Sequence, residues 1–348
     1  MRKPRTGNSG PTVADVARLA GVSPMTVSRV VNCEPNVLPS TRARVEEAVA
    51  ALGYRPNPAA RSLAGGQQCR IALLHANPSA AYLSEFLMGS LAQASLLDAQ
   101  LIVEPCNVDD DLAELVRRLA AHRVDAVLLP PPLCDNEALL AALHVADLPM
   151  AQIATGQPAS FAHALAIDDE AAAHAMTAHL IGLGHRHIGF IAGDSNQTAS
   201  ACRRAGYARA LSEAGIEIHA DLMVSGDFTY RSGLETAEAL LALSPRPTAI
   251  FACNDDMAAA AIAVAHRQRL AVPEDLTVCG FDDSAMSRTI WPEITTIHQP
   301  VAEMAKQATA ILAETVRGRA SGRSLAVQHL QLDYTLVRRA SDGVLESA

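Results

Sequence analysis

Small polar and cationic side chains near the amino terminus have the types and the spacing that DNA recognition needs. Residues 24–29, PMTVSR, place a threonine, a serine and an arginine beside the apolar Pro24 and Met25. Hydroxyl and guanidinium groups bind phosphate oxygens and the edges of bases. If residues 24–29 form an exposed helix, that helix could lie in a major groove. The alternative is an ordinary helical hairpin at the end of a domain.

Polar side chains that follow two expected strands, much later in the chain, could bind a small molecule. Asn254 follows the apolar segment 248–252, and Asp282 follows 276–280. An amide offers a donor and an acceptor, and a carboxylate offers two oxygens that can each accept from a hydroxyl group. Vicinal hydroxyl groups suit this pair, and open α/β sheets bind ligands at the carboxyl ends of their strands. The alternative is that both residues only cap the helices that follow them.

Sequence patterns of catalysis and metal binding are missing. The segment 182–189, GLGHRHIG, lacks the glycine spacing of a dinucleotide-binding fingerprint, and it precedes an expected strand instead of following one. His185 and His187 have no third ligand nearby in the sequence, so a zinc site is not expected. The sequence also contains no P-loop, GxSxG or HExxH motif. We therefore predict no enzyme activity, no metal site and no cofactor.

Two short helices around a glycine turn are expected to position residues 24–29. Thr12 can cap a helix over 13–20, and Asp15 stands where a capping-box acid or a favourable charge for the helix dipole belongs. Gly21 tolerates the positive φ that ends a helix, and Ser23 can cap the next helix, which begins with a proline. Valines and alanines recur at helical spacing along one side of both helices. The polar side of the second helix is therefore left outward.

A third helix and a short fourth helix should complete this module. The third is expected at about 40–52, and because Leu38 stands where a capping Ser or Asp is usual, we expect it to begin at Ser40. Asn57 can cap the fourth, at 58–63, which starts with a proline and is followed by two glycines. A helix, a turn of about three residues and a second helix form the helix-turn-helix arrangement of many DNA-binding proteins.

Residues 12–66 resemble the headpiece and hinge of the lactose-repressor (LacI/GalR) family of bacterial transcription factors. The motifs DVARLAGVS, TVSRVVN, LGYRPN and ARSLAGG stand in order and at the spacing of the family. The resemblance implies a sequence-specific regulator whose two subunits bind a pseudo-palindromic operator. The DNA-contacting positions that it implies are Thr12, Ser23, Pro24, Met25, Thr26, Ser28, Arg29, Asn32, Tyr54, Asn57, Ala60 and Leu63.

The resemblance implies different roles for these positions. Pro24 and Met25 occupy the variable positions of the family, so they are the expected readers of bases. The threonine, serine and arginine that follow would fix the register of the recognition helix. Leu63 matches the family leucine that wedges between base steps in the minor groove and kinks the DNA.

Charge is distributed unevenly along the chain. Residues 1–66 hold nine Lys and Arg against four Asp and Glu, a net +5, whereas residues 67–348 hold nineteen against thirty-three, a net −14. A basic head on an acidic body suits a protein of which only the head meets phosphate groups. Seven scattered cysteines without a CxxC pair favour a reducing cytosol. Because neither a signal peptide nor a membrane span is recognised, we expect a cytoplasmic location.

From Arg70 onward, short apolar strands alternate with helices in two rounds. The strands expected in the first round are 70–75, 101–105, 125–129 and 149–153, and the helices are 81–98, 109–122 and 135–146. A helix at 170–183 leads to strands 188–192, 222–225, 248–252 and 276–280, with helices 199–214, 230–243 and 255–269. Such alternation predicts two α/β lobes, each a doubly wound parallel sheet.

Two such lobes resemble the periplasmic sugar-binding architecture that the regulatory domain of the LacI/GalR family shares. By this resemblance the chain crosses between lobes near 166–168 and 298–299, adds a helix at about 300–317 to the first lobe, and returns for a last strand near 330–335. The expected domains are a disordered basic arm at 1–11, a helix-turn-helix headpiece at 12–57, a hinge helix and linker at 58–68, an effector-binding and dimerisation domain at 69–340, and a tail at 341–348. Lobe 1 takes about 69–166 and 299–325, and lobe 2 takes about 167–298 and 326–340.

Effector contacts are also implied by the resemblance. Asn254 and Asp282 hold the places of the family motifs ANDxMA and GxDD. Arg203 matches the arginine of the RxAG pattern that reaches into the cleft, where its fixed fork of donors can orient a polar ligand. A surface salt bridge is the alternative for this arginine.

Three further positions could touch the effector. Phe228 matches an aromatic position against the ligand, although a core phenylalanine is the alternative. Asn77 and Tyr82 could cover the ligand from the first lobe. Ala154 and Ala76 stand where family members often have an aspartate and a serine, which puts the identity of the ligand in doubt.

The favoured function is a repressor of a carbohydrate-utilisation operon that a sugar or glycoside releases. A purine or another metabolite acting as co-repressor is the alternative. A periplasmic-type sugar receptor would need an export signal, and a sugar-modifying enzyme would need catalytic carboxylates or a phosphate loop. The expected partners are double-stranded operator DNA, a small-molecule effector and a second copy of the chain in a homodimer, with no membrane involved.

Overall fold

The computed structural model describes residues 11–31, 37–54, 68–107 and 110–345. The chain divides into two compact units, residues 1–68 and 69–348, and each is described by itself. The expected basic arm, apart from Pro11, and the expected hinge helix at 58–63 lie outside the described residues. No helix in the described part of the chain is long and apolar enough to cross a membrane.

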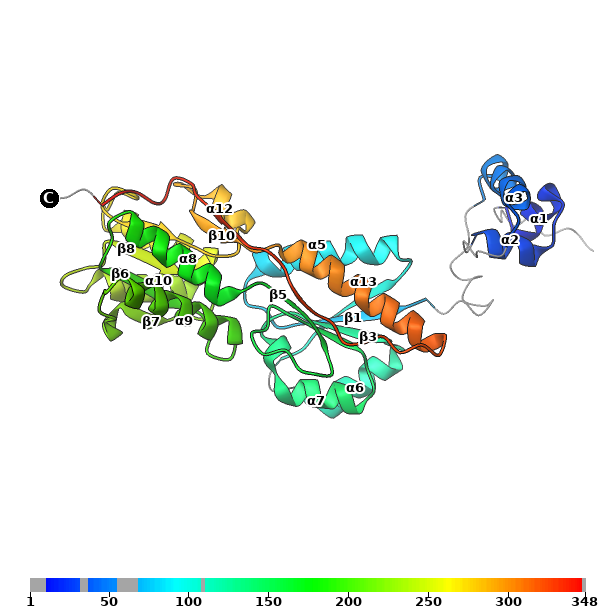
Figure 1. Cartoon of the computed structure of the whole chain (residues 1–348), viewed down its shortest axis with the longest axis horizontal. Coiled ribbons are helices and arrows are strands. Elements are labelled where there is room, and N and C mark those ends of the chain that lie inside the picture. Colours follow the sequence, from blue (N-terminus) through cyan, green and yellow to red (C-terminus); the bar gives the residue numbers. More distant parts are fainter. Residues whose placement is uncertain (1–10, 32–36, 55–67, 108–109, 346–348) are drawn as a thin grey trace, which may run out of the picture. The chain divides into compact units, whose positions relative to one another are not determined.

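Three helices, α1 (Val13–Ala20), α2 (Pro24–Val31) and α3 (Pro39–Leu52), form the headpiece in Figure 1. The predicted capping box is present, since Asp15 Oδ2 accepts from Thr12 N at 3.0 Å and Thr12 Oγ1 accepts from Asp15 N at 3.4 Å. Gly21 ends α1 with a φ of 61°. Ser23 Oγ accepts from Thr26 N at 3.1 Å at the start of α2. The local signals in the sequence therefore set the helix-turn-helix geometry.

The three helices enclose a small apolar core. Its buried members are Val16, Ala17, Ala20, Val27, Val30, Val45, Ala48 and Tyr54. The prediction that α3 begins at Ser40 is wrong by one residue. Pro39 takes the first helical position because its fixed φ suits a helix, and because an N–H at that position would have no partner within the helix in any case. Leu38, the residue before it, makes no side-chain capping hydrogen bond.

Six parallel strands form the sheet of the first lobe, in the order β11-β5-β4-β3-β1-β2. They are β1 (Arg70–His75), β2 (Gln100–Pro105), β3 (Ala126–Leu129), β4 (Met150–Ile153), β5 (His163–Ala166) and β11 (His329–Gln331). The helices of this lobe are α5 (Ala80–Leu96), η1 (Leu133–Asp135), α6 (Leu112–Ala121), α7 (Glu137–Val145) and α13 (Val301–Ala320). In β1, Ile71 and Leu73 face the apolar cluster of α5 and α13, whereas Ala72 and Leu74 face that of α6 and α7.

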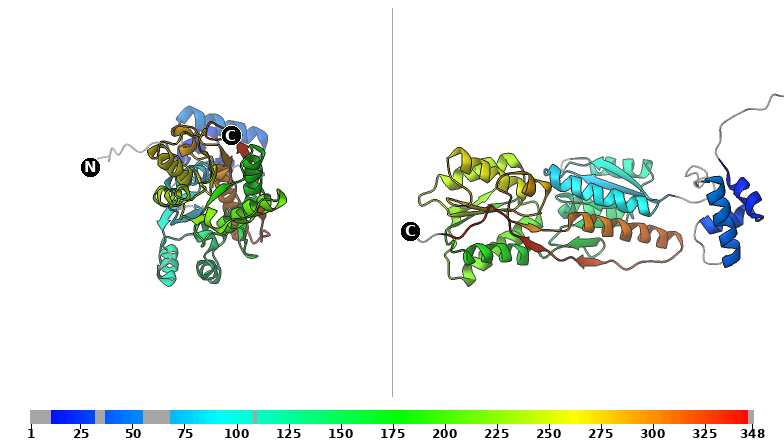
Figure 2. Two further views of the ribbon diagram at one scale, coloured as in Figure 1. Left: turned by 90° about the vertical axis from the view of Figure 1, so that its left-hand side faces the viewer. Right: turned by 90° about the horizontal axis from the view of Figure 1, so that it is seen from above.

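Helix α13 comes from late in the chain and packs on α5. Figure 2 shows the two helices lying alongside each other in its right-hand view. Their close approach passes through Gly89, where an added Cβ would stand 2.4 Å from Ala302 O. The first lobe therefore depends on a segment that follows the whole of the second lobe.

Four parallel strands form the sheet of the second lobe, in the order β7-β6-β8-β9. They are β6 (Ile188–Ala192), β7 (Met223–Ser225), β8 (Ala249–Ala252) and β9 (Thr277–Cys279). The helices are α8 (Asp169–Gly182), α9 (Thr198–Glu213), η2 (Ala220–Leu222), α10 (Tyr230–Leu241), α11 (Asp255–Arg267) and α12 (Ala285–Thr289). A separate antiparallel pair joins β10 (Thr296–His298) to β12 (Thr335–Val337). The prediction of two doubly wound parallel sheets is confirmed.

The chain runs between the lobes three times. It passes from β5 to α8 and from β10 to α13, and it returns for the last time between β11 and β12. The single strand expected near 330–335 is in fact two short strands. Since β11 pairs with β5 in the first lobe, the assignment of 326–331 to the second lobe is wrong. Strands of three residues carry too little periodicity to be placed from sequence.

Residues 341–345 are part of the second lobe, so the prediction of a tail at 341–348 is wrong for them. Ser341 is fully buried, and its Oγ accepts from Thr295 N at 2.9 Å. Asp342 accepts from Thr295 Oγ1 at 2.5 Å and is paired with His179. Leu345 N donates to Leu183 O at 2.9 Å. These polar contacts join residues far apart in sequence, which explains why no local pattern revealed them.

Replacing Gly206 with alanine is expected to destabilise the second lobe. Gly206 lies where α9 packs on α8, and an added Cβ would stand 2.1 Å from Glu170 O, which is backbone and cannot swing aside. We expect the free energy of unfolding in urea to fall by about 1–3 kcal/mol. Gly182→Ala is the matched control in α8, because no heavy atom lies within 4 Å of its added Cβ. Equal effects of both substitutions would contradict the packing argument.

Candidate functional site

Helix α2 presents the face that is expected to meet DNA. Val27 and Val30 are buried in the headpiece, so the opposite side of the helix is turned outward. The exposed residues of that side are Pro24, Met25, Ser28 and Arg29, and Thr26 is half-buried. Met25 is 66% exposed, so its side chain is accessible on this face.

Other predicted DNA contacts have structural roles in the headpiece. The hydroxyl of Thr12 donates to Asp15 Oδ2 at 2.7 Å, and that of Ser23 lies 2.9 Å from Thr26 Oγ1. Tyr54 is only 8% exposed and packs in the headpiece core, so it supports the module from inside. Four predicted contacts lie outside the described residues: Asn32, Asn57, Ala60 and Leu63.

All six predicted effector residues line one pocket between the two lobes. Asn77 and Tyr82 come from the first lobe, and the other four come from the second. The complete lining is Asn77, Ser79, Tyr82, Pro131, Ala154, Gln197, Ala199, Arg203, Phe228, Asn254, Asp282 and Gln299. The pocket lies at the carboxyl ends of the strands, where the strand order of each sheet reverses, β1 to β3 and β6 to β8. Its cavity measures only about 30 Å³.

Arg203 is a buried cation inside this pocket. The residue is 3% exposed, which excludes the surface salt bridge considered from the sequence. Its Nε donates to Asp169 Oδ1 at 2.7 Å, and its Nη1 donates to Cys253 O at 2.5 Å. The guanidinium carbon also lies 3.6 Å from the centre of the Phe281 ring. These contacts fix the plane of the guanidinium before any ligand binds.

Asp282 is a buried acceptor beside Arg203. Its Oδ1 accepts from Gln299 Nε2 at 2.6 Å and lies 3.8 Å from Arg203 Nη1. Burial raises the pKa of Asp282 to about 7, against the opposing charge of Arg203. Its φ of 103° lies in the left-handed region that non-glycine residues rarely adopt. Backbone strain of this kind is typical of functional sites.

Two buried oxygens in the pocket lack a hydrogen-bond partner among the described residues. They are Tyr82 Oη and Gln299 Oε1. Burial raises the pKa of Tyr82 well above its usual value, so its hydroxyl keeps its proton. Orphaned buried polar atoms are rare in folded proteins, and a bound ligand can satisfy them. The sequence did not identify Gln299, whose only signal was its place at the expected crossing near 298–299.

Asn254 and Phe228 line the pocket and also make structural contacts within the second lobe. Asn254 Oδ1 accepts from Met257 N at 3.0 Å, and its Nδ2 donates to Phe228 O at 2.9 Å. The helix-capping alternative for Asn254 is therefore realised in the structure. The Phe228 ring packs against Gly193, where an added Cβ would stand 1.9 Å from a ring carbon. Phe228 is thus a core residue that also lines the pocket.

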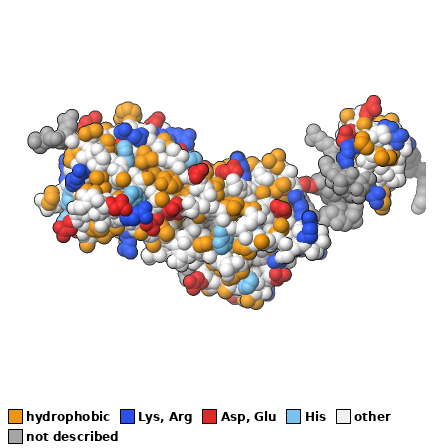
Figure 3. Space-filling view, in the orientation of Figure 1, with side chains coloured by type: hydrophobic (Ala, Val, Ile, Leu, Met, Phe, Trp, Pro, Cys, Tyr) orange, Lys and Arg blue, Asp and Glu red, His pale blue; other side chains and the backbone are white. Residues whose placement is uncertain are grey.

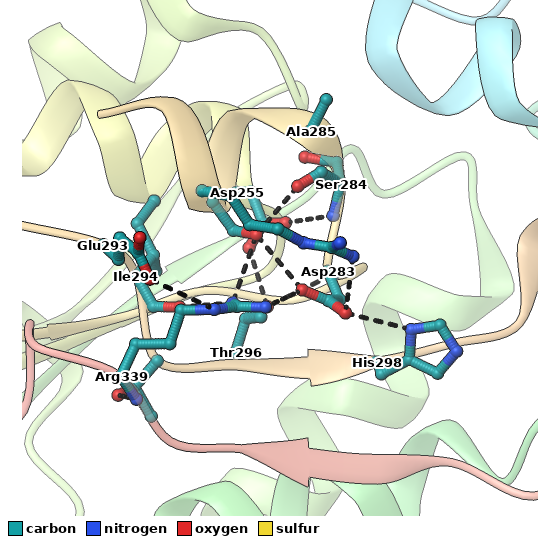
Figure 4. A network of polar contacts seen from close by, with 12 residues as sticks. Asp255, Asp283, Ser284, Ala285, Glu293, Ile294, Thr296, His298 and Arg339 are labelled. Carbon is teal, nitrogen blue, oxygen red and sulfur yellow. Dashed lines mark hydrogen bonds and ion pairs between the residues drawn. The ribbon is translucent and has the colours of Figure 1, made fainter. Parts of the chain in front are cut away.

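A polar network anchors the crossing strand next to the pocket, as Figure 4 shows. Asp283 pairs with Arg339 and accepts from His298 Nδ1 at 3.1 Å. Although burial opposes it, the Arg339 contact holds the pKa of Asp283 below its ordinary value. Asp255 accepts from Thr296 Oγ1 at 2.7 Å, and burial raises its pKa far above the usual value. The network joins β10 to the carboxyl-terminal segment through Asp283.

Replacing Asp282 with asparagine is expected to change how stability depends on pH. The pKa of Asp282 rises from 3.8 to about 7 on folding, so its ionised form is disfavoured in the folded state. Its contribution to the free energy of unfolding therefore falls as pH rises from 3.8 to about 7 and is constant above. The variant lacks this fall. We expect the stability of the variant relative to the parent, measured in urea, to increase across that window. A difference that does not vary with pH would contradict the assignment.

No group of side chains that could hold a metal ion is found within the described ranges. His185 Nδ1 is 2.9 Å from Thr248 Oγ1, and its Nε2 is 3.1 Å from Gly343 O. His187 Nε2 is 3.0 Å from Pro245 O. Both histidines are occupied by structural hydrogen bonds within the second lobe.

Comparisons with known proteins agree with this architecture. Residues 12–57 match the family model described as "Bacterial regulatory proteins, lacI family", and residues 177–341 match "Periplasmic binding protein-like domain". The chain is 34% identical over 308 residues to catabolite control protein A of Priestia megaterium, covering 86% of this chain and 91% of the relative. It is 35% identical over 324 residues to the HTH-type transcriptional repressor PurR of Aliivibrio salmonicida, covering 91% and 96%.

Solved structures give the same result. The lac repressor dimer bound to operator and the anti-inducer ONPF matches with a TM-score of 0.73 at 28% identity, over 97% of this chain and all of the other. The complex of the transcriptional regulator CelR with cellobiose matches with a TM-score of 0.72 at 31% identity, over 95% and 99%. The chain therefore belongs to the lacI family of bacterial regulatory proteins and is a DNA-binding transcriptional regulator.

Proposed function

We propose that the protein represses a carbohydrate-utilisation operon and is released when a sugar or glycoside binds the pocket between the lobes. The observation that carries this proposal is the set of oxygens in the pocket. Asp282, Gln299 Oε1 and Tyr82 Oη can take hydroxyl hydrogens, and Arg203 can donate to ring or hydroxyl oxygens. The CelR relative, which was solved with cellobiose, supports a sugar.

A purine or another flat metabolite acting as co-repressor is the second candidate. The observation that favours it is Phe228, whose ring lines the pocket and could stack on a base. The polar groups of the pocket would then pair with ring nitrogens and exocyclic groups in place of hydroxyl groups.

The proposed mechanism couples the two units of the chain. Two subunits of a homodimer in the cytoplasm would place their α2 helices in successive major grooves of a pseudo-palindromic operator. The solved lac repressor dimer on its operator supports this arrangement. Effector binding would change the spacing of the two heads, so that residues 58–63 lose their mutual support and affinity for the operator falls.

The distribution of charge supports the headpiece as the DNA-binding part. Residues 67–348 carry a net charge of −14. On the face that Figure 3 shows, acidic and basic side chains of residues 69–345 are interspersed with hydrophobic ones. Repulsion between this acidic domain and phosphate would disfavour wrong docking, which leaves the basic headpiece as the binding surface.

A thermal-shift screen of the full-length protein tests the effector class. We expect one sugar or glycoside to raise the melting temperature, because a ligand that binds only the folded state stabilises it by mass action. The same compound should not stabilise Asp282→Asn to the same extent. A shift with nucleobases or nucleosides and with no sugar would contradict the sugar proposal and favour the co-repressor.

A further inference from the structure

Hydrogen bonds join the two lobes directly on one side of the pocket. Thr198, the first residue of α9 in the second lobe, donates its backbone N–H to Asp135 Oδ2 of the first lobe at 2.8 Å. Thr198 Oγ1 also lies 3.0 Å from both carboxylate oxygens of Asp135. Gly156 N, from the loop after β4 in the first lobe, donates to Thr198 Oγ1 at 2.6 Å. One threonine thus binds two separate segments of the opposite lobe.

Helix α9 receives its amino-terminal cap from the other lobe. Gln197, the residue in the N-cap position, makes no side-chain capping hydrogen bond. The first N–H groups of a helix have no partner within it, and a carboxylate is favoured at this positive end of the helix dipole. By contrast, α6 and α8 are capped by Asp111 and Asp168, which directly precede them in the chain. The cap of α9 therefore exists only while the lobes are together.

Asp135 is held ready for this contact within its own lobe. Thr155 Oγ1 donates to Asp135 Oδ1 at 2.6 Å, and both residues belong to the first lobe. If the lobes separate, Asp135 keeps this neighbour, whereas the N–H of Thr198 loses its acceptor. The carboxylate would still point towards the gap, so the contact can form again without reorganisation.

A second interlobe hydrogen bond involves another pair of elements. Ser79 Oγ, at the start of α5, donates to Asp256 Oδ2 of α11 at 2.6 Å. With both contacts made, the pocket cavity of about 30 Å³ can hold about two water molecules but not a sugar ring. Entry of an effector of that size therefore requires the pocket lining to move, and separation of the two lobes moves both halves of that lining at once.

We propose that Asp135 and Thr198 form an interlobe latch, which sets the fraction of effector-free protein that is closed and thereby gates entry to the pocket. The inference rests on the proposed function only in treating this pocket as the effector site. Asp135 is a positioning residue, since it acts through α9, the helix that carries Arg203. Loss of a helix cap changes an equilibrium by about tenfold, so removal of Asp135 should lower the closed-to-open ratio by about that factor.

Distance measurement by double electron-electron resonance tests the latch in the full-length protein without DNA or effector. One nitroxide is attached at Val145→Cys in the first lobe, where the side chain is 87% exposed, and the other at Glu217→Cys, also exposed, in the second. Cys33 and Cys202 are first replaced by serine to limit labelling elsewhere. Labelled chains are mixed with an excess of unlabelled chains, so that the measured distances lie within one subunit. We expect one short, narrow distance in the parent and an added longer-distance population in Asp135→Ala.

Asp111→Ala is the matched control. It removes an aspartate cap of the same chemistry from α6, but that cap lies entirely within the first lobe. We expect its distance distribution to equal that of the parent. If Asp135→Ala does not fold, as judged by circular dichroism, Asp135→Asn replaces it. This substitution removes the charge but keeps an oxygen for Thr198 N, so a smaller shift is expected.

Several outcomes would overturn the latch. They are a parent that is already open, an Asp135 variant with an unchanged distribution, and a control that opens as much as the Asp135 variant. The experiment is independent of the proposed function because no ligand or operator takes part. A failed sugar screen leaves its outcome untouched, and an absent latch leaves the sugar proposal standing.

Discussion

Replacement of Arg203 with alanine is expected to abolish the effector response while operator binding persists. The guanidinium is the one strong donor fork among the pocket-lining side chains, and it lies between two buried carboxylates, Asp169 and Asp282. Its removal takes away the group that orients the ligand. It also leaves both carboxylates without their cation, which should cost about 3–5 kcal/mol of stability. Because the headpiece is a separate compact unit, its own fold should survive.

Two further variants separate binding from stability in this prediction. Arg204→Ala is the matched control, since it removes the same side chain from an exposed position of the same helix, and it should behave like the parent. Arg203→Lys keeps the positive charge near Asp169 but lacks the fork, so it should recover part of the stability without the effector response. Operator affinity would be measured by fluorescence anisotropy with and without the effector. Loss of operator binding in Arg203→Ala, with the chain still folded, would show that the residue is misplaced in this account.

Replacement of Arg29 with alanine is expected to weaken operator binding by about 10- to 100-fold, the range for loss of one good guanidinium contact to DNA. Arg29 lies on the exposed face of α2, where Met25 and Ser28 also lie. Arg44→Ala removes the same charge from an exposed position on α3 and should cost much less. Titrations on operator and on unrelated DNA show which contact is lost. Loss of a base contact reduces discrimination between the two sequences. Loss of a phosphate contact weakens binding to both sequences and lowers the salt dependence of binding.

Equal losses in Arg29→Ala and Arg44→Ala would mean that the headpiece binds only through its general positive charge. The helix-turn-helix reading of α2 would then have no support from binding, whatever its geometry.

Local signals in the sequence predicted the elements whose formation depends on neighbouring residues. The capping box of Thr12 and Asp15 and the left-handed Gly21 are both present, because each depends on residues within one helical turn. The long helices and the buried strands were recognisable from apolar periodicity. The convergence of Asn254 and Asp282 on one pocket follows from their places after strands, whereas Arg203 was placed there by its match to the RxAG pattern of the family.

Contacts between distant segments could not be predicted in the same way. Strand β5 has four residues and β11 has three, and β11 is defined by its pairing with β5 more than 160 positions earlier. Ser341 and Asp342 looked like a polar tail because their partners are distant in sequence: Thr295 lies just before β10, and His179 lies in α8. Asp135 read as the start of a helix, and only the folded chain shows that it caps a helix of the other lobe. The polar residues themselves were visible in the sequence, but the residues that they contact were not.

We propose that the basic headpiece binds duplex DNA and that a metabolite in the two-lobed domain controls this binding. Gel retardation of double-stranded fragments from the genome of the source organism, by the full-length protein at low ionic strength, tests it most directly. We expect a small subset of fragments to be retarded, and one compound from the thermal-shift screen to change their retardation. Failure to retard any fragment, whichever compound is added, would contradict it.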